Sequence, residues 1–248
     1  MNVLRAEVLK ALTTRLLLWF GLGLVGFLAL VVSIHIGTSD RFALTTESTQ
    51  RDVFQAAGLT AVVAVLVGSL LVTAEYNHGT INQSFLAVPI RERMLTAKLG
   101  VAAAAGAVLA VAAGAVTLIL AEVWYAGRGE TLDLGGGTLT PLLGTLAASV
   151  VAAAVGMGLG AVLRRQTAST VVILLWLLIG ENVIALVPGA ARYAPGHVLA
   201  ALVVAHRHSS ADTLGFGAAA AISLLYAAAL CAAGFAVVRR SDVPATGG

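Results

Sequence analysis

The chain has 248 residues, of which 59% are hydrophobic and 11% are charged, and its formal net charge at pH 7 is +3. Its mean hydropathy is +0.95. So few polar residues could not cover the surface of a water-soluble globule of this length. The composition therefore excludes a soluble domain and predicts a protein that lies in a lipid bilayer.

Six apolar segments are long enough to cross a bilayer, which takes about 20 residues in a helix. We predict an all-α integral membrane protein with a single transmembrane domain over residues 1–248. The spans are expected near residues 16–36, 54–74, 99–121, 141–163, 170–187 and 218–238. The first apolar run exceeds the roughly 7 to 15 residues of a signal peptide, so we interpret it as an uncleaved anchor.

Lysine and arginine residues are distributed unevenly around these spans. The N-terminal segment, the loops after the second and fourth spans and the C-terminal tail carry ten of the 15, whereas the other loops carry five. Basic residues are enriched on the cytoplasmic side of membrane proteins. We therefore predict a multi-pass protein of the plasma membrane with both termini in the cytoplasm. This orientation explains the basic excess, and we expect no binding of nucleic acid.

Residues 2–15 are predicted to form an amphipathic helix ahead of the first span. Apolar residues recur on one face at helical spacing, and polar residues share the other. Such a helix lies in the membrane interface, in contact with lipid, and keeps its charged side chains in water. The candidate residues are Arg5, Glu7 and Lys10. The alternative is a simple cytoplasmic extension of the first span.

The loop between the second and third spans contains a second predicted helix. Thr80 and Gln83 have the spacing of a capping box, which starts a helix. The helix should end before Pro89, because proline disfavours helical geometry in the preceding residue. Pro89 can in turn open the helix of the third span. We predict a helix of about two turns over residues 80–88, with Ile81 and Phe85 on one face.

The same loop carries the pattern Glu-Tyr-x-x-Gly-Thr-Ile, followed by Pro-x-Arg and a lysine. These residues are Glu75, Tyr76, Gly79, Thr80, Ile81, Pro89, Arg91 and Lys98. With six spans and an N-terminal amphipathic segment, the chain resembles membrane subunits of ATP-binding-cassette transporters of the ABC-2 permease type. The resemblance implies that the loop helix is a coupling helix, which docks in a groove of an ATPase subunit. The coupling residues that it implies are Glu75, Tyr76, Gly79, Thr80, Ile81, Asn82, Gln83, Phe85, Pro89 and Arg91.

In an ATP-binding loop the lysine directly follows a glycine, and the chain has no such lysine. Its two lysines, Lys10 and Lys98, follow Leu9 and Ala97. We therefore expect a non-catalytic subunit without a cofactor of its own. The resemblance implies two partner ATPase subunits, which bind ATP and Mg²⁺, and a second permease, identical or different. It also implies export of a hydrophobic or amphiphilic small molecule such as a drug, antibiotic or lipid. The alternatives are an ion-coupled secondary carrier and an intramembrane enzyme.

Glu181 and Asn182 lie in the outer half of the predicted fifth span. Ionisable residues inside a bilayer are costly and usually face a cavity or a partner, which makes both residues candidates for the translocation pathway. Glu181 could instead form a protonated, structural hydrogen bond. His35, near the outer end of the first span, is a possible partner.

The long outer loop between the last two spans contains a wholly apolar segment, residues 198–205. As a helix it would rise only about 12 Å, too little to cross the bilayer. We interpret it as a re-entrant gate helix or an interfacial helix. His197, His206, His208 and Asp212 are metal-binding residue types, but Arg207 separates two of the histidines and we expect no metal site. Gly156 and Gly160 predict a close helix–helix contact in the fourth span.

Overall fold

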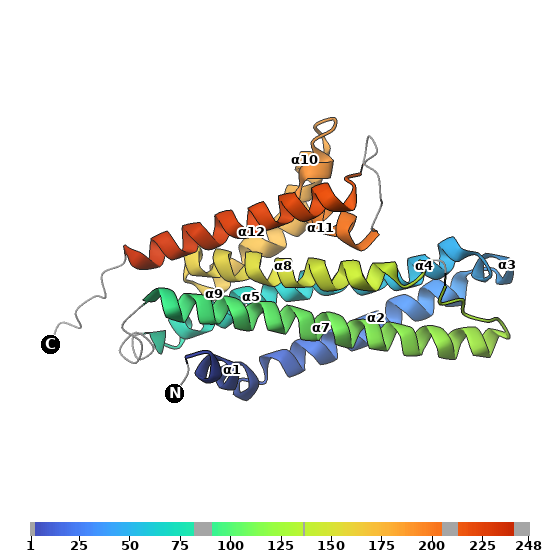
Figure 1. Ribbon diagram of the computed structural model, residues 1–248, viewed down its shortest axis with the longest axis horizontal. Helices are drawn as coiled ribbons and strands as arrows, with labels where there is room; N and C mark the ends of the chain where they lie inside the picture. The colour runs from blue at the N-terminus through green and yellow to red at the C-terminus, as the bar shows by residue number, and fades with distance from the viewer. Residues whose placement is uncertain (1–2, 82–90, 136, 205–212, 241–248) are drawn as a thin grey trace.

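The computed structural model describes residues 3–81, 91–135, 137–204 and 213–240. Every regular element in these ranges is a helix. Most helices run along the long axis of the molecule (Figure 1). The helix α1 (Val3–Thr13) lies at the same end of the bundle as the C-terminal end of α12 (Phe216–Arg239). The all-α prediction is therefore confirmed for the described residues.

Six helical segments are long and apolar enough to cross a membrane, as predicted. The first, third, fourth and sixth are α2 (Leu16–Thr38), α7 (Arg91–Arg128), α8 (Thr140–Leu163) and α12. The second span consists of α4 (Glu47–Gln55), the 3₁₀ turn η1 (Ala56–Leu59) and α5 (Thr60–Asn77). The fifth consists of α9 (Gln166–Leu175), the π-helical turn η2 (Trp176–Gly180) and α10 (Glu181–Ala185).

Two spans extend well beyond the predicted boundaries. The helix α7 has 38 residues, and the second span runs from Glu47 to Asn77. Hydropathy marks only the apolar part of each helix, whereas the backbone hydrogen bonds continue through polar turns at both ends. Short helices complete the chain: α3 (Arg41–Leu44), the 3₁₀ turn η3 (Ala191–Tyr193) and α11 (Pro195–Val204).

The central helix of the bundle is α8, which packs against α5, α7, α11 and α12. Its contact with α5 depends on residues that lack a side chain. A Cβ atom on Gly156 would overlap the carbonyl oxygen of Val65, and one on Gly68 would overlap that of Ala153. A Cβ on Gly160 would lie 2.8 Å from the carbonyl oxygen of Ser69. The predicted close contact through Gly156 and Gly160 is confirmed, and its partner is α5.

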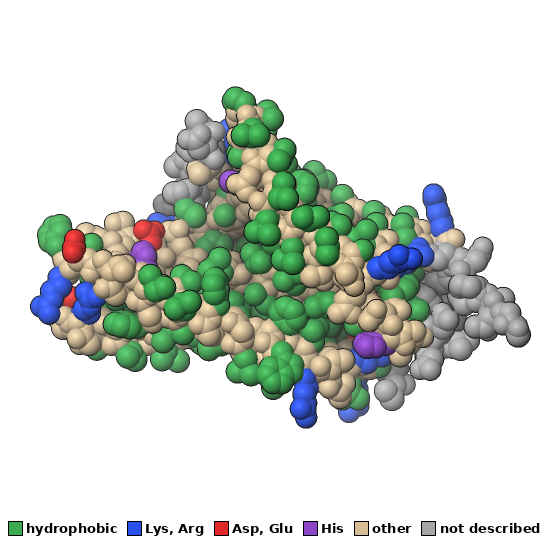
Figure 2. Space-filling view, turned by 180° about the vertical axis from the view of Figure 1, so that it is seen from behind, with side chains coloured by type: hydrophobic (Ala, Val, Ile, Leu, Met, Phe, Trp, Pro, Cys, Tyr) green, Lys and Arg blue, Asp and Glu red, His purple; other side chains and the backbone are tan. Residues whose placement is uncertain are grey.

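Hydrophobic side chains cover the middle of the molecular surface, and charged side chains lie mainly toward its two ends (Figure 2). On α2, for example, Leu18, Leu22 and Leu30 are more than half exposed. An exposed apolar band between two charged ends is the surface that a bilayer requires. The surface therefore agrees with the assignment of six membrane spans.

Candidate functional site

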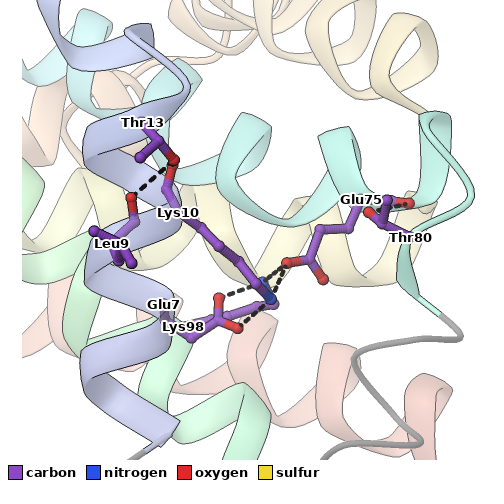
Figure 3. Close-up of polar contacts among 7 residues, drawn as sticks. All are labelled: Glu7, Leu9, Lys10, Thr13, Glu75, Thr80 and Lys98. Atoms are coloured by element: carbon purple, nitrogen blue, oxygen red, sulfur yellow. Dashed lines mark hydrogen bonds and ion pairs between the residues drawn. The ribbon is translucent and has the colours of Figure 1, made fainter.

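Four charged side chains from three helices meet at one end of the bundle. Glu7 and Lys10 come from α1, Glu75 from the last turn of α5, and Lys98 from α7 (Figure 3). The ammonium of Lys98 lies 2.6 Å from Glu7 Oε2 and 2.7 Å from Glu75 Oε1. The ammonium of Lys10 lies 2.8 Å from Glu7 Oε1 and 2.9 Å from Glu75 Oε1. We call these four residues the ionic cluster.

The ionic cluster is largely shielded from solvent. The side chain of Lys98 is only 2% exposed, and those of Glu7 and Glu75 are 7% and 11% exposed. Desolvating a charge is expensive, so each buried group here depends on its partners. Lys98 is the central cation, because it bridges a carboxylate of α1 and a carboxylate of α5 from a position on α7. The cluster therefore links three helices that approach one another at this end.

The position of α1 corrects one expectation from the sequence. Its polar face was expected in water, but Glu7 is buried against α5 and α7. Glu7 and Lys10 are three residues apart, so they share the inward face of the helix. Leu4, Leu9 and Leu12 point outward and are more than half exposed. The polar face turns inward because lysine and glutamate partners on the neighbouring helices compensate for the lost water.

Lys10 is the most accessible member of the cluster, with 45% of its side chain exposed. Partial burial alone would lower the pKa of its ammonium. Hydrogen bonds from the ammonium to Glu7 and Glu75, together with the two negative charges, outweigh this effect and raise the pKa above its ordinary value of 10.5. Lys10 is therefore charged throughout the physiological pH range.

The chain leaves the cluster through a helix-terminating turn at the end of α5. Gly79 has a φ of 67°, in the left-handed region that favours glycine. The amide of Thr80 donates to the carbonyl of Glu75 at 3.0 Å, and that of Gly79 donates to the carbonyl of Tyr76 at 3.4 Å. These two bonds form a Schellman motif. Gly79 thus ends the second span and directs the chain into the loop.

The structure describes only some of the predicted coupling residues, and these have different surroundings. Glu75 joins the cluster, Gly79 and Thr80 form the turn, Ile81 is buried, and Tyr76 packs against the main core. Arg91 is the first residue of α7, and Arg5 is exposed on α1. The residues Asn82, Gln83, Phe85 and Pro89, and with them most of the predicted helix over 80–88, lie outside the described residues.

Lys98 belonged to the sequence pattern but was not among the candidate coupling residues. The sequence signal for its role is a lysine near the start of an otherwise apolar span, which requires a buried anion. A cavity of about 950 Å³ borders the cluster. Its polar lining includes all four cluster residues together with His78, Thr80 and Gln166. The site therefore combines a fixed ionic junction with a cavity whose lining is partly polar and partly apolar.

A second polar site lies near the end of the fifth span. Glu181 is 8% exposed, and its Oε1 accepts from Trp176 Nε1 at 2.7 Å and from the amide of Gly196 at 2.8 Å. Its Oε2 lies 2.8 Å from His197 Nδ1. The prediction of His35 as a partner is wrong. The π-helical turn η2 brings Trp176, five residues earlier, onto the face of Glu181, and α11 supplies the other two partners.

Asn182 does not share the network of Glu181. Its side chain is exposed, and Nδ2 donates to the carbonyl of Leu178 at 2.8 Å. Within the described ranges no three His, Cys, Asp or Glu residues are close enough to hold a metal ion. His206, His208 and Asp212 lie outside these ranges.

The six spans define an integral, multi-pass membrane protein, and the ionic cluster lies where the loop between the second and third spans begins and ends. A family model described as ABC-2 family transporter protein matches residues 3–182. The chain therefore belongs to this family, whose members are membrane subunits of ATP-binding-cassette transporters and are generally non-catalytic. The match includes the whole ionic cluster and extends to Asn182. No curated protein matches the chain at a significant level.

Proposed function

We propose that this chain is the permease subunit of an exporter for a hydrophobic or amphiphilic small molecule, driven by separate ATPase subunits. The observation that carries the proposal is the ionic cluster. Glu75 lies in the last turn of α5 and Lys98 lies on α7, on either side of the loop that connects the second and third spans. An ATPase subunit that pushes on this loop would act on both flanking helices at once.

The cluster supplies a route for that push to a third helix. Glu7 binds the same ammonium of Lys98 that Glu75 binds, so α1 is held to both α5 and α7. Ion pairs with several short contacts in a shielded site resist separation more than exposed pairs do. In this proposal the three helices move together when the ATPase subunits close.

A separate apolar cavity supports the proposed class of cargo. Its volume is about 570 Å³, within the range of roughly 300 to 1,000 Å³ that is typical of small-molecule sites. It lies between the second and fifth spans, α8 and α11. Its lining includes Leu59, Val65, Ile173, Trp176 and Leu199. This lining favours an apolar molecule, or the apolar part of an amphiphile.

The complete transporter in this proposal contains two such permeases and two ATPase subunits, which bind ATP and Mg²⁺. The second permease is either a copy of this chain or a related one. The even number of spans puts α1 and the end of α12 at one end of the bundle (Figure 1). The loop-charge bias favours the cytoplasm for that end, in the plasma membrane.

Mild-detergent purification of the tagged chain from native membranes tests the proposal. We expect an ATPase subunit to copurify in equal amount, and ATP-dependent uptake of a hydrophobic dye into inside-out vesicles. Phe85→Asp, in the proposed docking helix, should abolish copurification without lowering the amount of chain in the membrane. Dye transport that persists without ATP and follows an ion gradient would contradict the proposal and favour a secondary carrier.

A further inference from the structure

The helix α11 is too short to cross a membrane, and it packs against α8 and α12. Its ten residues rise about 15 Å. Val198 and Leu202 are almost completely buried, and a Cβ on Gly144 of α8 would overlap the carbonyl oxygen of Leu202. Proline at position 195 suits the first turn of a helix. A close backbone contact with α8 therefore fixes α11 near its C-terminal end.

Charged side chains from two different spans hold the two ends of α11. At its N-terminus the carboxylate of Glu181, from the fifth span, accepts a hydrogen bond from the amide of Gly196. At its C-terminus the guanidinium of Arg51, from the second span, donates to the carbonyl of Val204 at 3.0 Å. The ends of a helix leave backbone amides and carbonyls unpaired. Glu181 accepts from one of these amides, and Arg51 donates to one of these carbonyls.

The carboxylate of Glu181 fits tightly between α11 and the fifth span. A Cβ on Gly196 would lie 3.0 Å from its carboxyl group, so the carboxylate is packed directly against the backbone of α11. Oε1 of Glu181, which accepts from the amide of Gly196, also accepts from the indole of Trp176. The ring of Trp176 packs on Gly180. Trp176 and α11 are thereby held to each other through one carboxylate.

Both of the parts that Glu181 joins form walls of the apolar cavity. Trp176 lines it from the fifth span, and Pro195, Gly196 and Leu199 line it from α11. Glu181 itself is not among the lining residues. Its two oxygens are occupied by hydrogen bonds to Trp176, Gly196 and His197. The carboxylate therefore holds residues of two cavity walls in place without lining the cavity itself.

We propose that Glu181 and Arg51 are positioning residues that hold α11 between the second and fifth spans and so fix the outer wall of the apolar cavity, including the ring of Trp176. Use of this cavity for cargo rests on the proposed function above, but the geometry of its wall does not. Of the two roles that the sequence leaves open for Glu181, the structure assigns the structural one.

The full-length chain, purified in detergent, allows a direct test through Trp176. The other two tryptophans, Trp19 and Trp124, are replaced by phenylalanine, so that Trp176 alone fluoresces. Glu181→Leu removes the acceptor from Trp176 and Gly196. Glu181→Gln removes the charge, but its amide oxygen can still accept both hydrogen bonds and its amide nitrogen can face His197. Asn182→Ala, at the exposed neighbouring position, is the matched control.

We expect Glu181→Leu to raise the acrylamide quenching constant of Trp176 by about threefold or more and to shift its emission. Glu181→Gln and Asn182→Ala should remain within about 30% of the parent protein. Arg51→Met, which releases only the far end of α11, should raise quenching less, by about 1.5-fold. If Glu181→Leu does not fold, Arg51→Met and Glu181→Gln decide the question alone.

Two results would overturn the proposal. One is unchanged quenching in Glu181→Leu or in Arg51→Met. The other is a Glu181→Gln protein as perturbed as Glu181→Leu, which would mean that the negative charge itself is required. The measurement needs neither an ATPase subunit nor transport, so it can succeed when the exporter proposal fails and can fail when that proposal succeeds.

Discussion

Within the described part of the chain, carboxylates are buried at two places, the ionic cluster and the end of the fifth span, and their partners differ. Glu75 of the ionic cluster is held by two lysine ammonium groups, whereas Glu181 is held by an indole, a backbone amide and a histidine. Loss of the charge on Glu75 would remove one of the two carboxylates that hold the buried ammonium of Lys98. A carboxylate bound by an indole and a backbone amide, which carry no charge, needs mainly its oxygen atoms. The comparison teaches that removing charge should be severe in the cluster and mild at Glu181.

The largest effect is expected from Lys98→Met. It leaves Glu7 and Glu75 buried with only the half-exposed Lys10 between them among the described residues, which should cost about 3–5 kcal/mol. Thermal unfolding in detergent measures the loss. The triple variant Glu7→Gln, Glu75→Gln, Lys98→Met removes the unpaired charges and should recover most of the stability. If Lys98→Met alone is as stable as the parent protein, the ion pairs of Lys98 contribute nothing to stability.

The next effect is expected at the α5–α8 contact, which contains no charge. Gly156→Ala should destabilise the protein by about 1–3 kcal/mol, because its methyl group would overlap the carbonyl oxygen of Val65 and push the helices apart. Gly23→Ala is the matched control, since nothing lies within 4 Å of a Cβ there. Equal melting temperatures for the two alanine variants would contradict the close packing.

A smaller loss is expected at the turn that leads from the cluster into the loop. Gly79→Ala places a side chain at a φ of 67°, which should cost about 1 kcal/mol. Gly37→Ala, at a helical position with open space, is the control. Urea titration of both variants compares them. No difference between them would mean that the turn after α5 does not need the left-handed conformation.

The smallest effect on stability is expected from Lys10, and its dependence on pH can be measured. Because its pKa is raised in the folded protein, its ion pairs contribute fully below the ordinary pKa of 10.5, and the contribution is lost as the pH rises through the raised pKa. The side chain is nearly half exposed, so the contribution should be about 0.5–1 kcal/mol. The difference in melting temperature between the parent and Lys10→Met should be equal at pH 7 and pH 9. A difference in melting temperature that becomes smaller from pH 7 to pH 9 would contradict the raised pKa.

The sequence predicts the spans well because each is a long apolar run, and the close helix contact because Gly156 and Gly160 are four residues apart. It does not predict that Glu7 and Lys10 face inward, since periodicity identifies the faces of a helix but not their neighbours. Lys98 lies 91 positions from Glu7 in the chain, so only the packed bundle shows that they pair. The partners of Glu181 depend on a π-helical turn, which no sequence pattern specifies, and on the packing of α11, whose existence the apolar segment at residues 198–205 indicates but whose neighbours it does not.

Measuring ATP hydrolysis and dye transport together, in vesicles that contain the copurified complex, tests the central claim most directly. The comparison is between the parent protein and the triple variant Glu7→Gln, Glu75→Gln, Lys98→Met, which should fold but lacks the ionic junction. We predict that the variant retains its ATPase subunit and most of its hydrolysis, while transport per ATP falls by at least tenfold. An unchanged ratio of transport to hydrolysis in a correctly assembled complex would contradict the claim that the ionic cluster couples the two.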